Sequence, residues 1–516
     1  MLSKTYSASI FGIEAIKIEV EVNTTGQGEN TIVSIVGLPD AAVKESKERI
    51  RSAIMSCGFI HPLGTTVVGL APADLRKEGA AFDLPIALCM LSQNCKLPKD
   101  KLASAMIAGE LALDGKIRPI KGALPISALA KKLKKEISLL IIPEENADEA
   151  AIVAGDEIPV FPVKNLKEAV DFFSGKIKIE RRRICLNDII NQAEQRDILD
   201  FADVKGQFYP KRALEIAAAG GHNVLMIGPP GTGKSMLAKR VPGILPPMHI
   251  EEALETTRIH SVLGQLPPGK ALLTERPFRA PHHTISDTGL FGGQSTPTPG
   301  EISLAHNGVL FLDELPEFKR NVLEVMRQPL ENGTVTVSRA AGSFTFPARF
   351  MLIAAMNPCP CGYYGSKNRV CRCNSHHIQR YRHKISGPLL DRIDIHIEVA
   401  QLTEDELVNT PSGEKSSEIR KRVEKARQIQ IERLKEWKLF CNAQMEPALL
   451  QKICKLSKES ITKMRHAMRE LSLSARAYDR ILRVARTIAD LENSEGIFEN
   501  HISEAIQYRS LDKRLW

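Results

Sequence analysis

The chain has 516 residues, 43% of them hydrophobic and 25% charged, and its formal net charge is +9. The length favours two to four domains, and the composition is ordinary for a soluble globular protein. Ten cysteines in so long a chain argue against a secreted disulfide scaffold, and neither a signal peptide nor a membrane-spanning run is expected. We therefore expect a cytoplasmic protein with reduced thiols. Its mild positive charge indicates either a polyanionic partner or a solvated basic surface.

The first 175 residues predict an α+β domain. Alternating apolar and polar residues favour a strand at Ile16–Val22, and a second strand is expected at Thr31–Val36. Asp40 is placed to cap a helix that begins near Ala41. The charged segment 176–198 that follows the domain is interpreted as a linker. Further expected elements are strands at Thr65–Leu70 and Ser138–Ile142 and a helix at Leu84–Leu91.

Three stretches of this domain resemble the Lon-protease-like domain of Lon and RadA. They lie at Leu70–Leu88, Ala108–Gly122 and Ile142–Asn146. Lon cleaves peptides with a Ser–Lys dyad, in which the lysine activates the hydroxyl. By the resemblance the serine position falls at Ala81 and the lysine position near Ile126, and neither residue can do that work. The resemblance therefore implies a non-proteolytic relative that serves in assembly or in contacting nucleic acid.

A phosphate-binding loop follows the linker. It fits the pattern G-x-x-x-x-G-K-[ST] and stands between an apolar strand, Asn223–Ile227, and the start of a helix, Ser235–Arg240. Glycines let backbone N–H groups turn inward around phosphate oxygens, and the strand–loop–helix order disfavours a chance turn. Lys234 would reach the β- and γ-phosphates, and the Ser235 hydroxyl would bind Mg²⁺. The nucleotide-binding residues predicted here are Gly228, Pro229, Pro230, Gly231, Thr232, Gly233, Lys234 and Ser235.

Two later apolar strands end in polar residues suited to ATP hydrolysis. The stretch Val309–Glu314 resembles a Walker B motif, in which Asp313 would hold Mg²⁺ through water and Glu314 would polarise the attacking water. A buried strand followed by surface acids is the alternative. Met351–Met356 is followed by Asn357, whose amide can bind the γ-phosphate and orient the water, as sensor 1 does in AAA+ ATPases.

Other segments resemble parts of AAA+ ATPases that contact the nucleotide. In that superfamily a segment like Asp203–Gln207 lies against the adenine, which assigns Val204 and Gly206 to nucleotide binding. Arg476 matches the sensor-2 arginine that contacts the γ-phosphate. Its place in the first turn of a helix opposes the helix dipole, which favours a functional role.

Ser386–Asp394 resembles the arginine-finger segment of the same superfamily, with Arg392 as the finger. A finger stabilises charge on the phosphoryl group held by the neighbouring subunit, so this assignment implies a ring. A salt bridge from Arg392 to Asp391 or Asp394 is the alternative. Weaker candidates for interface contacts are Arg380 and Arg382.

Two insertions resemble those of the helix-2-insert clade, which includes magnesium chelatases and MCM helicases. The first is Arg276–Gly300, which includes the Gly/Pro/Thr-rich Gln294–Gly300, and the second is a β-hairpin within Gly333–Pro347 that turns at Ala340–Gly342. In ring motors both insertions face the pore, where basic side chains contact phosphates. A surface hairpin with a solvated arginine is the alternative. The residues predicted to contact DNA are Arg339, Lys319 and Arg320.

Four cysteines occur within residues 359–373, as Cys359-Pro-Cys361 and Cys371-Arg-Cys373. Four thiolates can close a tetrahedral, structural Zn²⁺ site, although C-x-C spacing is tighter than the usual spacing. His376 and His377 are alternative ligands. Reduced cysteines in a loop are the alternative to a metal site.

The C-terminal region, 401–516, is rich in charged residues and leucine and predicts helices. Ser417–Trp437 is expected as a long charged helix. Ser474–Leu491 is expected as an amphipathic helix capped by Ser474, with an apolar stripe of Ile481, Val484, Ile488 and Leu491.

The order of these parts resembles the magnesium-chelatase-like YifB/ComM family over nearly the whole chain. The resemblance implies a multidomain fold: a Lon-protease-like (ribosomal protein S5 domain 2-like) domain at 1–175, a linker at 176–198, an α/β AAA+ core at 199–400 and an α-helical lid at 401–516. It implies ATP and Mg²⁺ as cofactors.

For function, the family implies a homohexameric helicase acting on single-stranded and branched DNA. Such a motor promotes branch migration when incoming DNA recombines in natural transformation, with recombination proteins as partners and no membrane. The alternatives are the ATPase subunit of a metal chelatase, against which the missing integrin-like module argues, and a protein-remodelling ATPase.

Overall fold

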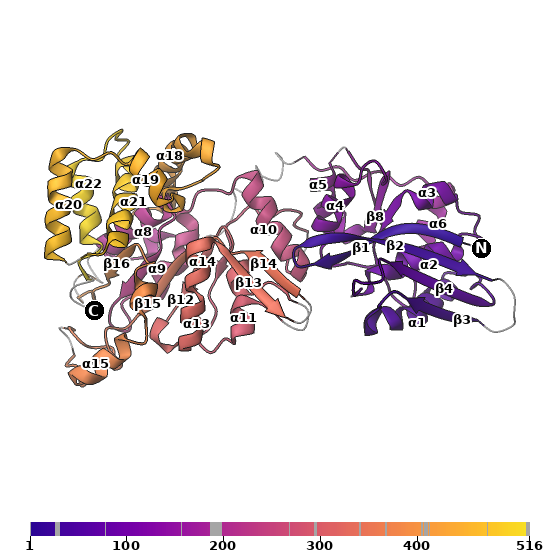
Figure 1. Ribbon diagram of the computed structural model, residues 1–516, viewed down its shortest axis with the longest axis horizontal. Coiled ribbons are helices and arrows are strands. Elements are labelled where there is room, and N and C mark those ends of the chain that lie inside the picture. Colours follow the sequence, from indigo (N-terminus) through magenta and orange to yellow (C-terminus); the bar gives the residue numbers. More distant parts are fainter. Residues whose placement is uncertain are drawn as a thin grey trace. The chain divides into compact units, whose positions relative to one another are not determined.

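The computed structural model describes residues 2–25, 31–77, 79–155, 157–185, 199–267, 269–293, 297–339, 342–366, 369–403, 406, 411, 413–471 and 473–511. The expected hairpin turn at Ala340 and Ala341, part of Gln294–Gly300 and most of the linker 176–198 lie outside these residues. The chain forms two compact units (Figure 1). Unit 1 comprises Met1–Glu194 and Ile250–Thr274, and unit 2 comprises Gln195–His249 and Glu275–Trp516.

Unit 1 contains a seven-stranded mixed sheet in the order β3-β4-β2-β1-β5-β8-β9. Its longest pair is antiparallel, between β1 (Leu2–Phe11) and β2 (Glu14–Thr24). The expected strands correspond to β2, β3, β4 and β8, whereas β1 was not expected. The remaining strands are β3 (Ile32–Val36), β4 (Thr65–Ala71), β5 (Ala105–Ile107), β8 (Leu139–Pro143) and β9 (Val160–Val163), and β6 (Glu110–Leu111) pairs separately with β7 (Ile117–Arg118).

The helices of unit 1 pack on this sheet or on one another. The expected cap of α1 (Ala41–Ser56) is confirmed, because Asp40 Oδ1 accepts a hydrogen bond from the Val43 amide at 2.8 Å. Ala81 lies in the turn before α2, and Ile126 is buried in α4, so the two positions compared with the Lon dyad carry no reactive group. The other helices are α2 (Asp83–Leu91), α3 (Lys99–Ala103), α4 (Ala123–Lys132), α5 (Ala147–Ala154), α6 (Leu166–Phe173) and α10 (Ile250–Leu263).

Helix α10 belongs to unit 1, although the chain before and after it belongs to unit 2. It packs on α4. The Gly122 amide donates to the Ser261 carbonyl at 2.9 Å, and Arg258 forms an ion pair with Glu14 at 2.9 Å. The domain predicted at 199–400 includes this helix, whereas the structure groups the helix with unit 1. The sequence does not reveal this grouping, because contacts between such distant segments leave no local pattern.

The core of unit 2 is a five-stranded parallel sheet in the order β11-β12-β15-β10-β16. The strands β10, β12 and β15 are buried along their whole length, which explains why they read as uninterrupted apolar runs. Their carboxyl ends meet at one edge, where ligands of such sheets bind. The strands are β10 (Val224–Ile227), β11 (Phe278–Arg279), β12 (Val309–Leu312), β15 (Met351–Met356) and β16 (Ile395–Glu398).

Both segments predicted as insertions lie in unit 2. The hairpin is confirmed as β13 (Thr334–Arg339) and β14 (Gly342–Pro347), which pair from Thr334 with Pro347 to Arg339 with Gly342 (Figure 1). The first insertion contains α11 (Asp287–Phe291). The other helices of the core are α8 (Phe208–Gly220), α9 (Lys234–Arg240), α12 (Glu301–Leu304), α13 (Arg320–Val325), α14 (Arg327–Asn332), α15 (Ser375–Arg382) and α16 (Gly387–Leu390).

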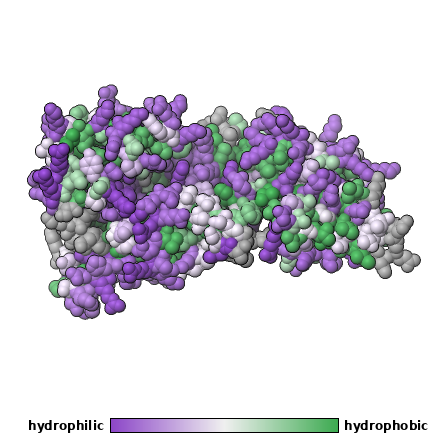
Figure 2. All heavy atoms as spheres, viewed as in Figure 1, coloured by the Kyte–Doolittle hydropathy of each residue, from purple (hydrophilic) through white to green (hydrophobic). Residues whose placement is uncertain are grey.

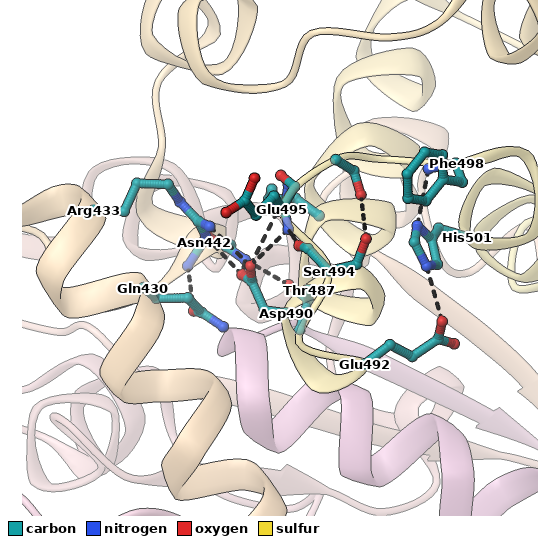
Figure 3. A network of polar contacts seen from close by, with 12 residues as sticks. Gln430, Arg433, Asn442, Thr487, Asp490, Glu492, Ser494, Glu495, Phe498 and His501 are labelled. Atoms are coloured by element: carbon teal, nitrogen blue, oxygen red, sulfur yellow. Dashed lines mark hydrogen bonds and ion pairs between the residues drawn. The ribbon is translucent and has the colours of Figure 1, made fainter.

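The C-terminal part of unit 2 is helical, as expected. Ser474 Oγ accepts a hydrogen bond from the Ala477 amide at 3.2 Å and caps α21. In Figure 3, Asp490 of α21 lies at the centre of a polar network, where it accepts hydrogen bonds from Arg433, Arg486 and Asn442. The helices are α18 (Ser416–Leu434), α19 (Pro447–Ile453), α20 (Lys458–Glu470), α21 (Ala475–Leu491) and α22 (Glu499–Gln507).

Hydrophilic side chains predominate on the face of the molecule seen in Figure 2. Among the described residues, none of the helices combines the length and the hydropathy that crossing a membrane requires.

Candidate nucleotide site

The phosphate-binding loop connects β10 to α9 at the carboxyl edge of the parallel sheet. Gly231 and Gly233 have φ angles of +80° and +88°, in the left-handed region that favours glycine. At position 228 a glycine is needed for a steric reason, because a Cβ there would lie 2.2 Å from the Val399 carbonyl oxygen. The Thr232 hydroxyl donates to the carbonyl of Pro229 at 3.0 Å. The predicted loop 228–235 is therefore compact, and its glycines are dictated by geometry.

Lys234 folds back over this loop. Its Nζ donates to the carbonyls of Gly228 and Pro229 at 2.6 and 2.8 Å and to Asn357 Oδ1 at 3.3 Å. Only 8% of the residue is exposed. Burial lowers the pKa of the Lys234 ammonium to about 8, against the opposing charges of Asp313 and Glu314. The contact with Asn357 joins two predicted site residues that lie 123 positions apart in the sequence.

Ser235 and Asp313 bring two oxygen ligands together. Ser235 Oγ donates to Asp313 Oδ2 at 2.6 Å and joins the phosphate-binding loop to the end of β12. Mg²⁺ prefers oxygen ligands and keeps several waters, so a hydroxyl and a carboxylate beside a phosphate-binding loop fit a hydrated ion carried by a nucleotide. Bound there, the ion would neutralise charge on the phosphates.

Glu314 follows Asp313 in a left-handed backbone conformation, with φ of +52°. Few non-glycine residues adopt it, and such residues are found most often at functional sites. Its carboxylate is 53% exposed, and Oε2 lies 3.2 Å from Nδ1 of His283. His283 was not among the predicted site residues, because no pattern within the first insertion indicates that it lies beside Glu314.

The segment assigned to the adenine lies next to the loop. Val204 is buried, and Gly206 adopts φ of +57° beside Leu402. The contact with the phosphate-binding loop comes from Gln207, whose Nε2 donates to the carbonyls of Ala400 and Thr232 at 2.8 and 3.4 Å. Gln207 was not among the predicted site residues, because an amide in a turn carries no motif of its own.

Arg392 is held within its own chain. Its side chain is 5% exposed and pairs with Glu331 of α14 and with the Pro388 carbonyl. The alternatives of a bridge to Asp391 or Asp394 are wrong, because the side chain of Arg392 pairs with Glu331. Burial lowers the pKa of the Arg392 guanidinium, and the charges of Arg327 and Arg476 act in the same direction. Arg476 itself is exposed in the first turn of α21.

Asp394, two residues later, holds the helical region to the sheet. It pairs with Arg480 of α21 and with His222 Nδ1 at 3.5 Å, and it accepts a hydrogen bond from the Asn223 amide at 3.1 Å. Burial alone would raise its pKa, but the charge of Arg480 and the contact with His222 hold the pKa of Asp394 well below its usual range. The pairing fixes α21, and with it Arg476, against the sheet of unit 2.

Three family models match the chain. "Magnesium chelatase, subunit ChlI" matches residues 200–407, and "Subunit ChlI of Mg-chelatase" matches residues 19–146. "Magnesium chelatase, subunit ChlI C-terminal" matches residues 413–509. The chain therefore carries AAA+ domains of the magnesium-chelatase type, with an α/β N-terminal region and a helical C-terminal region.

Relatives that match over the full length of the chain show which family it belongs to. The competence protein ComM of Haemophilus influenzae is 43% identical over 516 residues, a match that covers 100% of this chain and 98% of ComM. The chain belongs to the YifB/ComM family. The uncharacterized protein YifB of Escherichia coli is 42% identical over the same shares. The magnesium-chelatase 38 kDa subunit of Rhodobacter capsulatus is more distant, at 25% identity over 32% of this chain and 52% of that subunit.

The two insertions of this YifB/ComM-family chain meet. A Cβ on Gly293, in the first insertion, would lie 2.8 Å from Val337 and 3.4 Å from Arg339 of the hairpin. Asp287 of α11 accepts a hydrogen bond from Asn321 of α13 at 2.5 Å. The three residues predicted to contact DNA are exposed: Arg339 at the end of β13, and Lys319 and Arg320 at the start of α13.

The two arginines named as interface candidates differ in this YifB/ComM-family chain. Arg380 is exposed on α15. Arg382 is buried, donates from Nε to the Pro358 carbonyl at 3.2 Å and lies over the ring of Tyr364. Arg382 therefore holds the loop after β15 in place.

The cysteine cluster of the YifB/ComM-family chain lies in that loop. The Sγ atoms of Cys359, Cys361, Cys371 and Cys373 all lie within 4.8 Å of one another. The alternative ligands His376 and His377 are exposed at the start of α15 and are not part of this group.

Nucleotide affinity is expected to fall as the pH rises above 8. The folded-state pKa of Lys234 is about 8 in the free site, whereas phosphates would keep its ammonium protonated when bound. Binding then takes up a proton between about pH 8 and the pKa of the complex, and affinity drops about tenfold per pH unit. Titration calorimetry from about pH 7.5 to about pH 9.5 measures this slope. In Lys234→Arg the charge persists and the slope should vanish; equal slopes in both proteins would contradict the prediction.

Proposed function

We propose that this chain is an ATP-hydrolysing motor that acts on DNA. It would assemble as a homohexamer in the cytoplasm, use ATP and Mg²⁺, and drive branch migration of single-stranded and branched DNA while incoming DNA is recombined, together with recombination proteins. Similarity over the full length to a competence protein supports this function over that of a chelatase subunit.

The contact between His283 and Glu314 carries the proposal. His283 belongs to the first insertion, and Gly293 of the same insertion lies against Arg339 of the hairpin. The first insertion therefore contacts the exposed Arg339 of the hairpin through Gly293 and the proposed general base through His283. A DNA strand held by Arg339 would act on the insertion that contacts Glu314, which links DNA binding to hydrolysis.

The first test is the ATPase rate with single-stranded DNA, forked DNA, porphyrin or an unfolded protein. We expect stimulation by DNA alone. Stimulation by porphyrin in the presence of chelatase partner subunits would favour the metal-chelatase alternative. Stimulation by unfolded protein would favour remodelling. A branch-migration assay with a four-way junction follows a positive result, and failure to move the junction would restrict the proposal to a DNA-stimulated ATPase.

Arg339→Ala is expected to weaken DNA binding without changing nucleotide affinity. For each phosphate of single-stranded DNA that the protein no longer neutralises, the slope of log affinity against log salt becomes shallower by about 0.7. Fluorescence anisotropy with labelled single-stranded DNA at several salt concentrations measures that slope. The neighbouring Ser338→Ala, also exposed, is the matched control, and equal slopes for the two variants would refute binding of a phosphate by Arg339.

His283→Ala is expected to raise hydrolysis in the absence of DNA. The side chain of Glu314 is more than half exposed, so loss of its ion pair with His283 should change the free energy by about 0.2–1 kcal/mol, or the rate by roughly 1.4- to 5-fold. Stimulation by DNA should shrink correspondingly, because the insertion no longer contacts the base. His282→Ala, which removes the adjacent ring, is the control. An unchanged ratio of stimulated to basal rate in His283→Ala would show that the contact has no regulatory role.

A further inference from the structure

The four cysteines of the loop after β15 are arranged for one metal ion. Cys359, Cys361 and Cys371 have Sγ–Sγ distances of 3.4, 3.5 and 3.6 Å, and Cys373 completes the group within 4.8 Å. A tetrahedron with Zn–S bonds of about 2.3 Å has edges of about 3.8 Å. The observed spacing is close to that value and well beyond the roughly 2.05 Å of a disulfide bond.

Hydrogen bonds to sulfur support a thiolate site. The Tyr364 amide donates to Cys359 Sγ at 3.3 Å, and the Cys373 amide donates to Cys371 Sγ at 3.4 Å. Such donors stabilise negative charge on metal-bound sulfur and orient it. Four thiolates leave no open position on a tetrahedral ion, which is the pattern of a structural site.

The same loop contacts the nucleotide site. Cys359 follows the predicted sensor Asn357 by two residues, and a Cβ on Gly362 would lie 2.7 Å from Pro230 Cδ and 3.9 Å from Asn357 Cγ. Gly362, between the two cysteine pairs, therefore packs directly on the phosphate-binding loop. The other end of the loop is fixed by Asn374, which caps α15 by accepting a hydrogen bond from the His377 amide at 2.8 Å.

We propose that Cys359, Cys361, Cys371 and Cys373 bind one Zn²⁺, and that the metal-bound loop holds Pro230 and Asn357 in the conformation that binds nucleotide. Zinc is then a structural cofactor of the ATPase site. The inference rests on the proposed nucleotide site but does not depend on DNA as the substrate.

Metal content of the purified full-length protein is the first measurement. Elemental analysis should find about one zinc per chain in the wild type and in Cys185→Ser, whose exposed thiol lies outside the cluster. The double variant Cys371→Ser, Cys373→Ser should bind none. Protein purified without zinc should take up Co²⁺ and show the thiolate charge-transfer band of a tetrahedral site. Iron in place of zinc, or neither zinc nor Co²⁺ uptake, would overturn the zinc assignment.

The second measurement is the affinity for a fluorescent ADP analogue. Removing zinc from the wild type with a mercurial and a chelator should weaken binding at least tenfold, and adding zinc back should restore it. Gly362→Ala should keep its zinc yet bind the analogue more weakly, because the added Cβ displaces Pro230. Unchanged affinity after zinc removal would overturn the link to the nucleotide site. If both results hold but no DNA stimulates hydrolysis, the DNA motor fails and the zinc proposal stands.

Discussion

Glu314→Gln is expected to bind Mg-ATP as tightly as the wild type and to hydrolyse it about 10²–10⁴-fold more slowly, the range for loss of a general base. The side chain is 53% exposed and its ion pair is with His283, so the amide leaves the fold intact. It keeps the same shape, but it cannot take a proton from the attacking water. Single-turnover hydrolysis, together with the affinity for ATP, separates the chemical step from binding.

Glu317→Gln is the matched control for that variant. Glu317 is also an exposed acid, in the turn that follows, and it pairs with Lys384 at 3.1 Å. Its turnover should remain near that of the wild type. A Glu314→Gln protein that retains most of its hydrolysis would remove Glu314 from the catalytic role and leave its left-handed backbone without a catalytic explanation.

Arg392→Ala is expected to lower turnover by about 10³-fold or more, the range for arginine fingers. As a finger, Arg392 must leave Glu331 and the Pro388 carbonyl and reach the phosphates of the neighbouring subunit. Mixing Arg392→Ala with Lys234→Ala subunits should restore part of the activity. At such a mixed interface, the subunit with an intact Lys234 binds ATP, and its neighbour supplies an intact Arg392.

Glu331→Gln tests the competing structural role. It removes the charge of the acid, whose side chain is 48% exposed, while the amide oxygen can still accept a hydrogen bond from Arg392, so the decrease in stability should be smaller than in Arg392→Ala. If Arg392 acts as a finger, Glu331→Gln should retain turnover or exceed the wild type, since the arginine is released. Equal decreases of activity and thermal stability in both variants, with no rescue on mixing, would make Arg392 a structural residue.

The parallel strands of unit 2 could be predicted because a strand that is buried on both faces consists of consecutive apolar residues. The site residues that follow β10, β12 and β15 could be predicted because each comes directly after such an apolar run. In the structure Lys234 contacts Asn357, and Ser235 contacts Asp313. Strand β1 could not be predicted, because Ser3, Thr5 and Ser7 are buried where an apolar residue is expected. Its small hydroxyl side chains fit inside, as Thr5 does by donating to the Ala105 carbonyl at 3.1 Å.

Contacts between distant segments account for the rest of what the sequence did not reveal. Gln207, His283 and the Glu331 partner of Arg392 each reach across the fold to residues from another element. Each of these residue types is ordinary for the segment in which it occurs. Only the packing of unit 2 brings these side chains to the candidate site. The cysteines differ, because two close pairs already indicate four ligands, and the structure adds their distances and their contact with the phosphate-binding loop.

The position of α10 bears on how the protein is made. Unit 1 includes a helix that is encoded after the phosphate-binding loop, so a ribosome synthesises β10, that loop and α9 before this helix. The face of α4 that α10 covers in the finished protein therefore stays open to solvent until α10 has been synthesised.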